Sequence, residues 1–200
     1  MRKINLQLNN TKIPILVGSN ILKTINPENY VKENDVVIIT NSTIAKLYLK
    51  QTKRMFKDYN VDSLILRDGE KYKNIKTLQQ IHDYLIKNKY DRSLTIVALG
   101  GGVIGDMVAF AADTFMRGVQ LIHIPTTLLA QVDSAIGGKT GVNSHFGKNL
   151  IGSFYQPQLV VIDTELLKSL PKKEMICGYA EILKHAIIKD KSFFNWLKNN

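Results

Sequence analysis

Apolar and polar residues alternate near the start of this chain with a period of two. The apolar positions fall at every second residue in the stretches 4–8 and 13–17. This pattern is typical of strands with one covered face, and the two stretches are close enough to pair. We therefore predict a β-hairpin, with Asn9 and Asn10 in its turn.

Three short, continuous apolar runs follow, at residues 36–40, 63–66 and 94–99. Runs of this length are typical of strands that are buried on both faces of a sheet. Between them, apolar residues recur every three or four positions, which predicts helices over about residues 43–57 and 74–87. Strands that alternate with helices predict βαβ units and hence a parallel sheet.

The pattern changes after Ile162. The next three segments have helical spacing with no strand between them: residues 164–169, 172–189 and 191–198. The sequence therefore predicts an α/β fold, with a Rossmann-like parallel-sheet domain over residues 1–162 followed by the start of an all-α domain over residues 163–200. The last apolar positions have no later element to pack against, so we expect the helical domain to be truncated.

Composition narrows the class of protein. The chain is 44% hydrophobic, has one cysteine (Cys177), and contains no apolar run long enough to cross a bilayer. The N-terminus lacks the apolar core of a signal peptide, so we expect a cytoplasmic protein without a membrane partner. The net charge of +10 comes from lysines spread along the whole chain. Because they form no basic block, we expect no nucleic-acid partner, although a positive cleft would suit a small anionic substrate.

A glycine-rich turn follows the apolar run 94–99. Gly100, Gly102 and Gly105 match the pattern G-x-G-x-x-G, which places free peptide N–H groups at a helix N-terminus, where they can hold a pyrophosphate. The alternative is a tight strand-to-helix crossing without a ligand. No convincing ribose-binding carboxylate lies about twenty residues later, so the motif alone leaves both open.

A second glycine-rich stretch lies at residues 137–149, which we predict to be a loop. Glycine costs conformational entropy and is usually kept where a backbone approaches a ligand closely. Lys139, Lys148 and Asn149, with Asp133 before them, would suit a phosphate or a carboxylate. The alternative is an ordinary surface loop.

The other candidate residues have plainer explanations. Glu181, Lys184 and His185 share one helical face, where a Glu–Lys ion pair is usual and a Glu–His pair is only half of a metal site. His82 and His123 are expected to be structural, on a helix surface and within a strand respectively. Arg117 ends a helix and could complement its dipole.

Taken together, these motifs closely resemble the 3-dehydroquinate synthase family. The resemblance covers about residues 36–190 in collinear order and is carried by the segments GGGVIGD (100–106), MRG (116–118), PTTLL (125–129), VDSAIGGKT (132–140), GKNLIG (147–152), FYQP (154–157) and GYAEILK (178–184). The family fold has an NAD-binding domain followed by a helical metal-binding domain. A collinear run of this kind is far more specific than any single glycine motif.

The resemblance implies where NAD would bind. One group of residues comes from the turn after the second apolar run: Asp68, Gly69, Glu70, Lys71, Tyr72 and Lys73. A second group comes from the first glycine turn and the strand that follows: Gly102, Val103, Ile104, Gly105, Asp106, Thr126 and Thr127. The remaining implied NAD residues are Lys139, Lys148, Leu166, Leu167, Lys168 and Ser169. Glu70 and Lys73 would hold the adenosine end.

The resemblance also implies the substrate and metal sites. The sugar phosphate substrate would meet Lys139, Lys184, Asp133, Asn149 and Lys148, and Arg117 would reach the substrate of the second subunit in a homodimer. Glu181 falls on the first of three ligands to a divalent metal, zinc or cobalt. The other two family ligands are histidines beyond residue 200, and none of the four histidines here matches them.

The implied activity is that of a lyase, which converts 3-deoxy-D-arabino-heptulosonate 7-phosphate to 3-dehydroquinate and phosphate in the shikimate pathway of aromatic amino acid biosynthesis. Two alternatives stay open. One is a related metal- and NAD-dependent alcohol or glycerol dehydrogenase, although a neutral polyol needs no phosphate-binding lysines. The other is a non-catalytic NAD-binding remnant.

Overall fold

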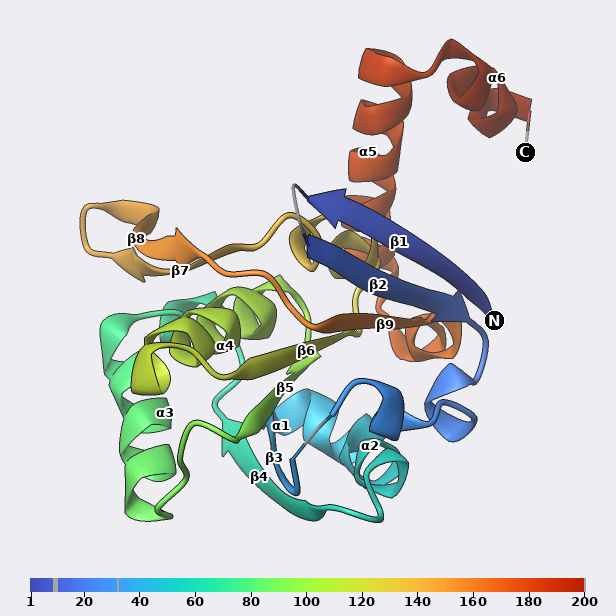
Figure 1. Cartoon of the computed structure of the whole chain (residues 1–200). Helices are drawn as coiled ribbons and strands as arrows, with labels where there is room; N and C mark the ends of the chain where they lie inside the picture. Colours follow the sequence, from blue (N-terminus) through green and yellow to red (C-terminus); the bar gives the residue numbers. More distant parts are fainter. Residues whose placement is uncertain (9–10, 32, 200) are drawn as a thin grey trace.

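A seven-stranded sheet runs through the middle of the protein (Figure 1). The computed structural model describes residues 1–8, 11–31 and 33–199. In spatial order, the strands are β1 (Arg2–Leu8), β2 (Thr11–Gly18), β9 (Leu159–Asp163), β6 (Gln120–Pro125), β5 (Thr95–Gly100), β3 (Asp35–Asn41) and β4 (Asn60–Leu66). All neighbours pair in parallel except β1 and β2, so the predicted Rossmann-like parallel sheet is confirmed.

Helices cover both faces of this sheet (Figure 1). On one face lie α3 (Ile75–Lys87) and α4 (Gly102–Thr114), followed by the short turn η5 (Phe115–Arg117). The other face is covered by η1 (Ile21–Lys23), η2 (Pro27–Asn29), and a helical stretch made of α1 (Ser42–Ile44), η3 (Ala45–Leu49) and α2 (Lys50–Met55). The short helices near the site are η4 (Glu70–Tyr72), η6 (Ala130–Ser134) and η7 (Thr164–Ser169).

The central strands show why their apolar runs are continuous. Val37 and Ile39 of β3 point into the core beneath α3 and α4, whereas Val36 and Ile38 point into the opposite core. All four are fully buried, and each such side chain contributes about 1.5–3 kcal/mol through removal from water. The prediction of buried strands at 36–40 and 94–99 is confirmed.

The second apolar run, at 63–66, forms a strand as predicted, but this strand is buried only in part. It belongs to β4, which pairs with β3 only and forms the edge of the sheet. Leu66 is 2% exposed, whereas Ile65 is 50% exposed. A continuous apolar run thus did not distinguish an edge strand from a central one.

Two of the helices begin directly after an asparagine whose side chain caps them. The Oδ1 atom of Asn41 accepts a hydrogen bond from the backbone N–H of Ile44, and that of Asn74 accepts from Thr77. These bonds satisfy N–H groups that have no partner within the helix. Both helices thus begin close to the predicted residues. Ile75, expected on the buried face of α3, is exposed instead.

The second glycine-rich stretch forms a β-hairpin, so our prediction of a loop was wrong. The strand β7 (Lys139–Ser144) pairs antiparallel with β8 (Gly147–Phe154), and both stand apart from the main sheet. The N-terminal hairpin β1–β2 is confirmed, while its predicted turn at Asn9 and Asn10 lies outside the described residues.

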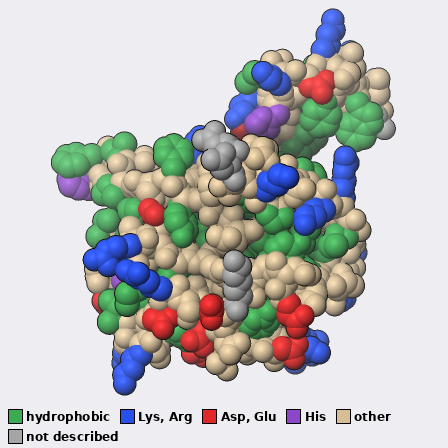
Figure 2. Space-filling view, viewed as in Figure 1, with side chains coloured by type: hydrophobic (Ala, Val, Ile, Leu, Met, Phe, Trp, Pro, Cys, Tyr) green, Lys and Arg blue, Asp and Glu red, His purple; other side chains and the backbone are tan. Residues whose placement is uncertain are grey.

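The chain ends in helices, as predicted. α5 (Lys172–Lys189) rises away from the sheet and leads into α6 (Lys191–Asn199) (Figure 1). In the space-filling view, this part of the chain stands out from the body of the protein (Figure 2). Gly178 brings α5 against the segment before η6, since a Cβ there would lie 2.6 Å from the backbone nitrogen of Leu129. Among the described residues, no helix combines the length and apolar character needed to cross a membrane.

Candidate functional site

The first glycine turn joins the end of β5 to the start of α4. Its glycines allow close packing: a Cβ on Gly100 would lie 2.7 Å from Ile104, and one on Gly101 would lie 2.9 Å from Thr127. No side chain caps α4 at Gly101, so the N–H groups of its first turn stay available at the positive end of the helix dipole. Ile104 itself points into the core. The turn therefore offers backbone donors to an anion.

The turn at residues 68–73 is fastened to the neighbouring strand end. The Asp68 carboxylate accepts from Asn41 Nδ2 at 2.9 Å and from Thr43 Oγ1 at 2.6 Å. Gly69, at φ 118°, occupies a conformation that favours glycine. Both acceptor oxygens of Asp68 are thus engaged within the protein.

Glu70 ties the same turn to the second hairpin. Its Oε1 atom accepts from Asn143 Nδ2 at 2.8 Å and lies 3.6 Å from the exposed Nζ of Lys148. On the outer side, the guanidinium of Arg67 and the ammonium of Lys71 face the Tyr72 ring and lower the pKa of its hydroxyl, the Arg67 interaction being the larger cause.

Lys73 occupies the centre of the site. It is only 4% exposed, and its Nζ donates to Asp106 Oδ2 at 2.5 Å and to Asn149 Oδ1 at 2.5 Å. Burial raises the pKa of Asp106, and the Lys73 ammonium offsets part of that rise. One ammonium thus joins the 68–73 turn, helix α4 and hairpin β7–β8.

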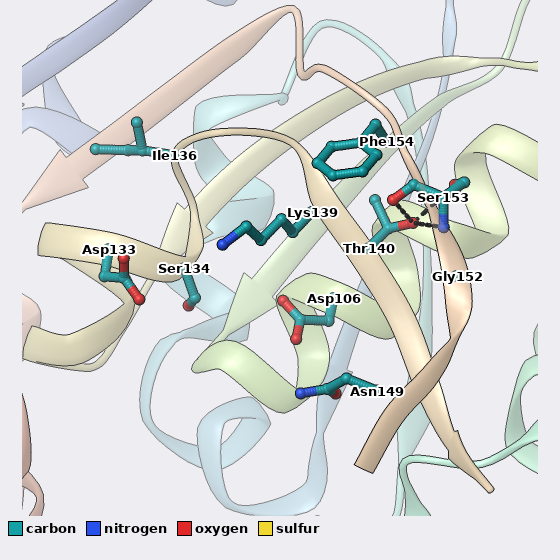
Figure 3. Close-up of a pocket in the computed structure, with 10 residues that line it drawn as sticks. All are labelled: Asp106, Asp133, Ser134, Ile136, Lys139, Thr140, Asn149, Gly152, Ser153 and Phe154. Atoms are coloured by element: carbon teal, nitrogen blue, oxygen red, sulfur yellow. Dashed lines mark hydrogen bonds between the residues drawn. The ribbon is translucent and has the colours of Figure 1, made fainter. Parts of the chain in front are cut away.

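A pocket of about 510 Å³ opens between α4, the hairpin and η6 (Figure 3). It is lined by Asp106, Asp133, Ser134, Ile136, Lys139, Thr140, Asn149, Gly152, Ser153 and Phe154. The Lys139 side chain extends from β7 toward Asp133 and Ser134 (Figure 3). The pocket therefore combines a cation, an amide and two carboxylates, and the charge of one carboxylate, Asp106, is balanced by its ion pair with Lys73.

Two threonines follow β6 beside this pocket. Thr127 is structural in part, because its Oγ1 accepts from the backbone N–H of Ala130 at 3.2 Å. Thr126 is 2% exposed, and its Oγ1 has no hydrogen-bond partner among the described residues. An unpaired buried hydroxyl is costly, so Thr126 is the more open of the two to a ligand.

The segment 166–169 packs against η3. Leu166 is buried in the core, while its carbonyl accepts from the Tyr48 hydroxyl at 3.0 Å. Ser169 forms a second hydrogen bond with that hydroxyl. Lys168 pairs with Glu165 at 2.7 Å, which raises the pKa of Lys168. Leu167 takes part in none of these hydrogen bonds or ion pairs.

Glu181, Lys184 and His185 meet as their spacing predicts. Glu181 Oε1 forms an ion pair with the Lys184 ammonium and lies 3.5 Å from His185 Nε2. The pairing raises the pKa of Lys184. The same Oε1 atom is shielded from solvent and lies between the ammonium and the imidazole.

The structure adds a third group that the sequence did not reveal. A ligand atom of Asp133 lies with those of Glu181 and His185, all within 4.8 Å of one another. The sequence predicted Asp133 as a substrate residue only. Carboxylate and imidazole ligands suit zinc or cobalt, so the half-site predicted from spacing becomes a three-ligand cluster.

Arg117 lies apart from these residues. It follows the far end of α4, and thirteen helical residues span about 20 Å. Met116, Arg117 and Gly118 all have positive φ values, of 50°, 68° and 114°, which turn the chain sharply toward β6. Arg117 therefore does not join the pocket of its own chain.

The two structural histidines are confirmed. His82 contacts the Leu78 carbonyl and the Thr114 hydroxyl on the surface of α3. His123 is buried in β6, and burial lowers its pKa to about 4. Neither lies in the metal-ligand cluster.

The family described as 3-dehydroquinate synthase N-terminal matches residues 63–177. The 3-dehydroquinate synthase of Hydrogenovibrio crunogenus is 49% identical over 203 residues, which cover 100% of this chain and 56% of that protein. The chain thus spans little more than half the length of such relatives.

Two solved structures have folds similar to that of this chain. A 2-deoxy-scyllo-inosose synthase complexed with carbaglucose-6-phosphate, NAD⁺ and Co²⁺ has a TM-score of 0.87 at 29% identity, covering 94% of this chain and 52% of that one. The 2-epi-5-epi-valiolone synthase of Streptomyces hygroscopicus subsp. jinggangensis, with NAD⁺ and Zn²⁺ bound, has a TM-score of 0.86 at 28% identity, covering 97% and 54%.

Proposed function

Because the chain belongs to the 3-dehydroquinate synthase family, we propose that it forms the NAD-binding part of an enzyme that converts 3-deoxy-D-arabino-heptulosonate 7-phosphate to 3-dehydroquinate and phosphate, a lyase reaction. The observation that carries this proposal is the polar pocket at the N-terminus of α4, where Lys139, Asn149 and Asp133 meet. Residues 1–162 would form the cofactor-binding domain, and residues 163–200 the start of the helical domain.

NAD fits the residues at the ends of β5 and β6. The uncapped first turn of α4 would hold the pyrophosphate through the N–H groups of the segment 102–106, and the unpaired Thr126 hydroxyl would donate to the cofactor. The 68–73 turn and the segment 166–169 would flank it. When bound, NAD supplies a hydride acceptor that is regenerated within each turnover.

A divalent metal would bind Glu181, which the resemblance gives as the first of three ligands, and Asp133 and His185 lie close enough to it to contribute within this chain. The Glu181 Oε1 atom, which is shielded from solvent and faces the His185 imidazole, supports this assignment. Three protein ligands with an open position are typical of catalytic zinc, and relatives of known structure hold Co²⁺ or Zn²⁺. When bound, such a metal supplies a Lewis acid that polarises a substrate oxygen.

The charged side chains around the pocket would orient the substrate. Lys139 and Lys184 would attract its phosphate and carboxylate groups, and Lys148 lies on the exposed rim. Fixing both anionic ends leaves one orientation for the reacting carbon atoms, which is how positioning contributes to rate.

We also propose a homodimer in the cytoplasm. Arg117 lies beyond the end of α4 that is far from the pocket, so its predicted substrate contact requires a second subunit. Cys177 is exposed and free, which suits a reducing compartment.

Titration calorimetry of the purified chain with NAD and with NADP tests the cofactor assignment. We expect NAD to bind more tightly, because the Glu70 carboxylate would repel a 2′-phosphate. Glu70→Ala should weaken NAD binding and reduce the discrimination, while Glu28→Ala, a matched change at an exposed position of η2 outside the site, should alter neither. Equal affinities for NAD and NADP in the unaltered chain would contradict the assignment.

A further inference from the structure

The buried lysine at the centre of the site directs two of its three ammonium hydrogens to acceptors within the protein. Lys73 is 4% exposed, and its ammonium is held at 2.5 Å by both Asp106 and Asn149. Charge-assisted hydrogen bonds of this length are strong, and breaking either would remove a partner from a buried ammonium. The Lys73 side chain therefore holds other residues of the site in place.

The contact with Asn149 fixes the direction of an amide. An ammonium group only donates hydrogen bonds, so the amide must turn its Oδ1 atom toward Lys73. Its Nδ2 group then faces away from Lys73 as a donor, and Asn149 lines the pocket beside Asp106 (Figure 3). A freely rotating amide would present oxygen and nitrogen alternately.

The backbone around Asn149 is held by the same turn. Asn149 has φ 57°, and its N–H donates to Asn143 Oδ1 at 2.9 Å. The N–H of Asn143 in turn donates to the Lys73 carbonyl at 2.9 Å. Residue 73 thus positions Asn149 through its side chain and supports its strand through its main chain.

We propose that Lys73 is a positioning residue, which holds the Asn149 amide so that its Nδ2 donates to the sugar phosphate substrate. This inference rests on the proposed function for the identity of the ligand, but not for the orientation of the amide. It assigns the Lys73 side chain to the substrate side of the site rather than to the adenosine end of NAD.

Two ligand titrations and one spectroscopic measurement test this role. The variants are Lys73→Met, Asn149→Asp and the control Lys87→Met, which removes an exposed ammonium from the last turn of α3, outside the site. In Lys73→Met we expect the affinity for 3-deoxy-D-arabino-heptulosonate 7-phosphate to fall at least tenfold, while that for NAD changes less than threefold. Lys87→Met should leave sugar phosphate binding unchanged. A tenfold loss of NAD affinity with unchanged sugar phosphate binding in Lys73→Met would overturn the proposal.

Asn149→Asp covers the case in which Lys73→Met fails to fold. The carboxylate keeps an acceptor for Lys73 but removes the donor, so sugar phosphate binding should again fall at least tenfold. Unchanged binding in this variant would refute a donor role for the amide.

The NMR signals of the Asn149 side-chain amide provide a readout without any ligand. They should be shifted and slow to exchange in the unaltered chain and in Lys87→Met, and should move to free-amide positions in Lys73→Met. If the unaltered chain binds neither NAD nor the sugar phosphate, the proposed function fails, and these signals still decide whether Lys73 orients Asn149. Identical signals in all three proteins would refute that orientation.

Discussion

The two glycine-rich stretches have similar compositions but use glycine for different physical reasons. In the first, Gly100, Gly101 and Gly102 have no positive φ, and each lacks room for a Cβ. In the second, Gly137, at φ 102°, has open space around it, so its backbone conformation alone requires glycine. The first stretch packs a helix against a strand, whereas Gly137 turns the chain into the first strand of the hairpin. Glycine density alone therefore does not indicate which role applies.

The largest effect is expected at Gly152, which pairs with Gly141 within the hairpin. A Cβ on Gly152 would lie 1.9 Å from the Thr140 carbonyl oxygen, a clash that only backbone movement can relieve. Gly152→Ala should lower the free energy of opening of the hairpin by about 3 kcal/mol or more. Amide hydrogen exchange over residues 139–154 measures this change.

Gly147→Ala is the matched control within the same strand. Its Cβ would meet only the flexible end of Leu150, at 3.1 Å, so exchange should change little. Similar exchange in the two variants would show that the clash at Gly152 is not what the hairpin depends on.

The second prediction concerns unfolding at acid pH. It bears on the first glycine-rich stretch because the ring of His123 lies close to Gly105. Burial lowers the pKa of His123 from 6.5 to about 4, so the unfolded chain binds a proton that the folded chain does not. The stabilising contribution is complete above pH 6.5 and is lost as the pH falls toward 4, by about 3 kcal/mol in total. Urea unfolding at several pH values measures it.

His123→Gln removes the titrating group from the same position. The difference in unfolding free energy between the two proteins should depend on pH only between about 4 and 6.5. Parallel pH profiles for the two proteins would mean that His123 is not the source of acid sensitivity.

The third effect, smaller than the first two, is expected at Gly101. A Cβ there would lie 2.9 Å from Thr127 Cγ2, and Thr127 is held by its hydrogen bond from Ala130. Gly101→Ala should therefore cost about 2 kcal/mol of unfolding free energy through overpacking. Adding Thr127→Ser removes the clashing methyl group but keeps the hydroxyl, so the double variant should regain most of the loss.

Gly105→Ala tests whether a second glycine of the same motif also lacks room for a side chain. Its Cβ would lie 3.6 Å from His123, which is ordinary contact, and alanine is favoured inside a helix. This variant should be more stable by about 0.5–1 kcal/mol. A loss equal to that of Gly101→Ala would show that the glycines of this turn share one role.

Much of the fold could be predicted because the spacing of apolar residues along the chain indicates which positions are buried. The spacing of Leu78, Ile81 and Leu85 predicted α3, and the apolar run ending at Leu99 predicted β5. The same reasoning failed for Ile65, since burial of an edge strand depends on whether another element covers it. It also failed for the β7–β8 hairpin, where glycine frequency suggested a loop.

The candidate site could be predicted only in part. Local motifs identified the residues around α4, and helical spacing brought Glu181 and His185 together. The approach of Asp133 to that pair depends on how α5 packs against η6, which no local pattern contains. For Lys73, the sequence indicated a functional turn but not that its ammonium is buried.

The order of strands has a consequence for synthesis on the ribosome. β2 pairs with β9, joining Ile15 to Val160, so the first hairpin to be made must wait for nearly the whole sheet before it can dock. At about 5–20 residues per second, this wait lasts roughly 7–30 s. During that time Ile13, Ile15 and Leu16, all buried in the finished protein, lack their final partners. Nascent chains of this protein should therefore depend on chaperone protection at their N-terminal end, although the core around β3 and β5 can form earlier.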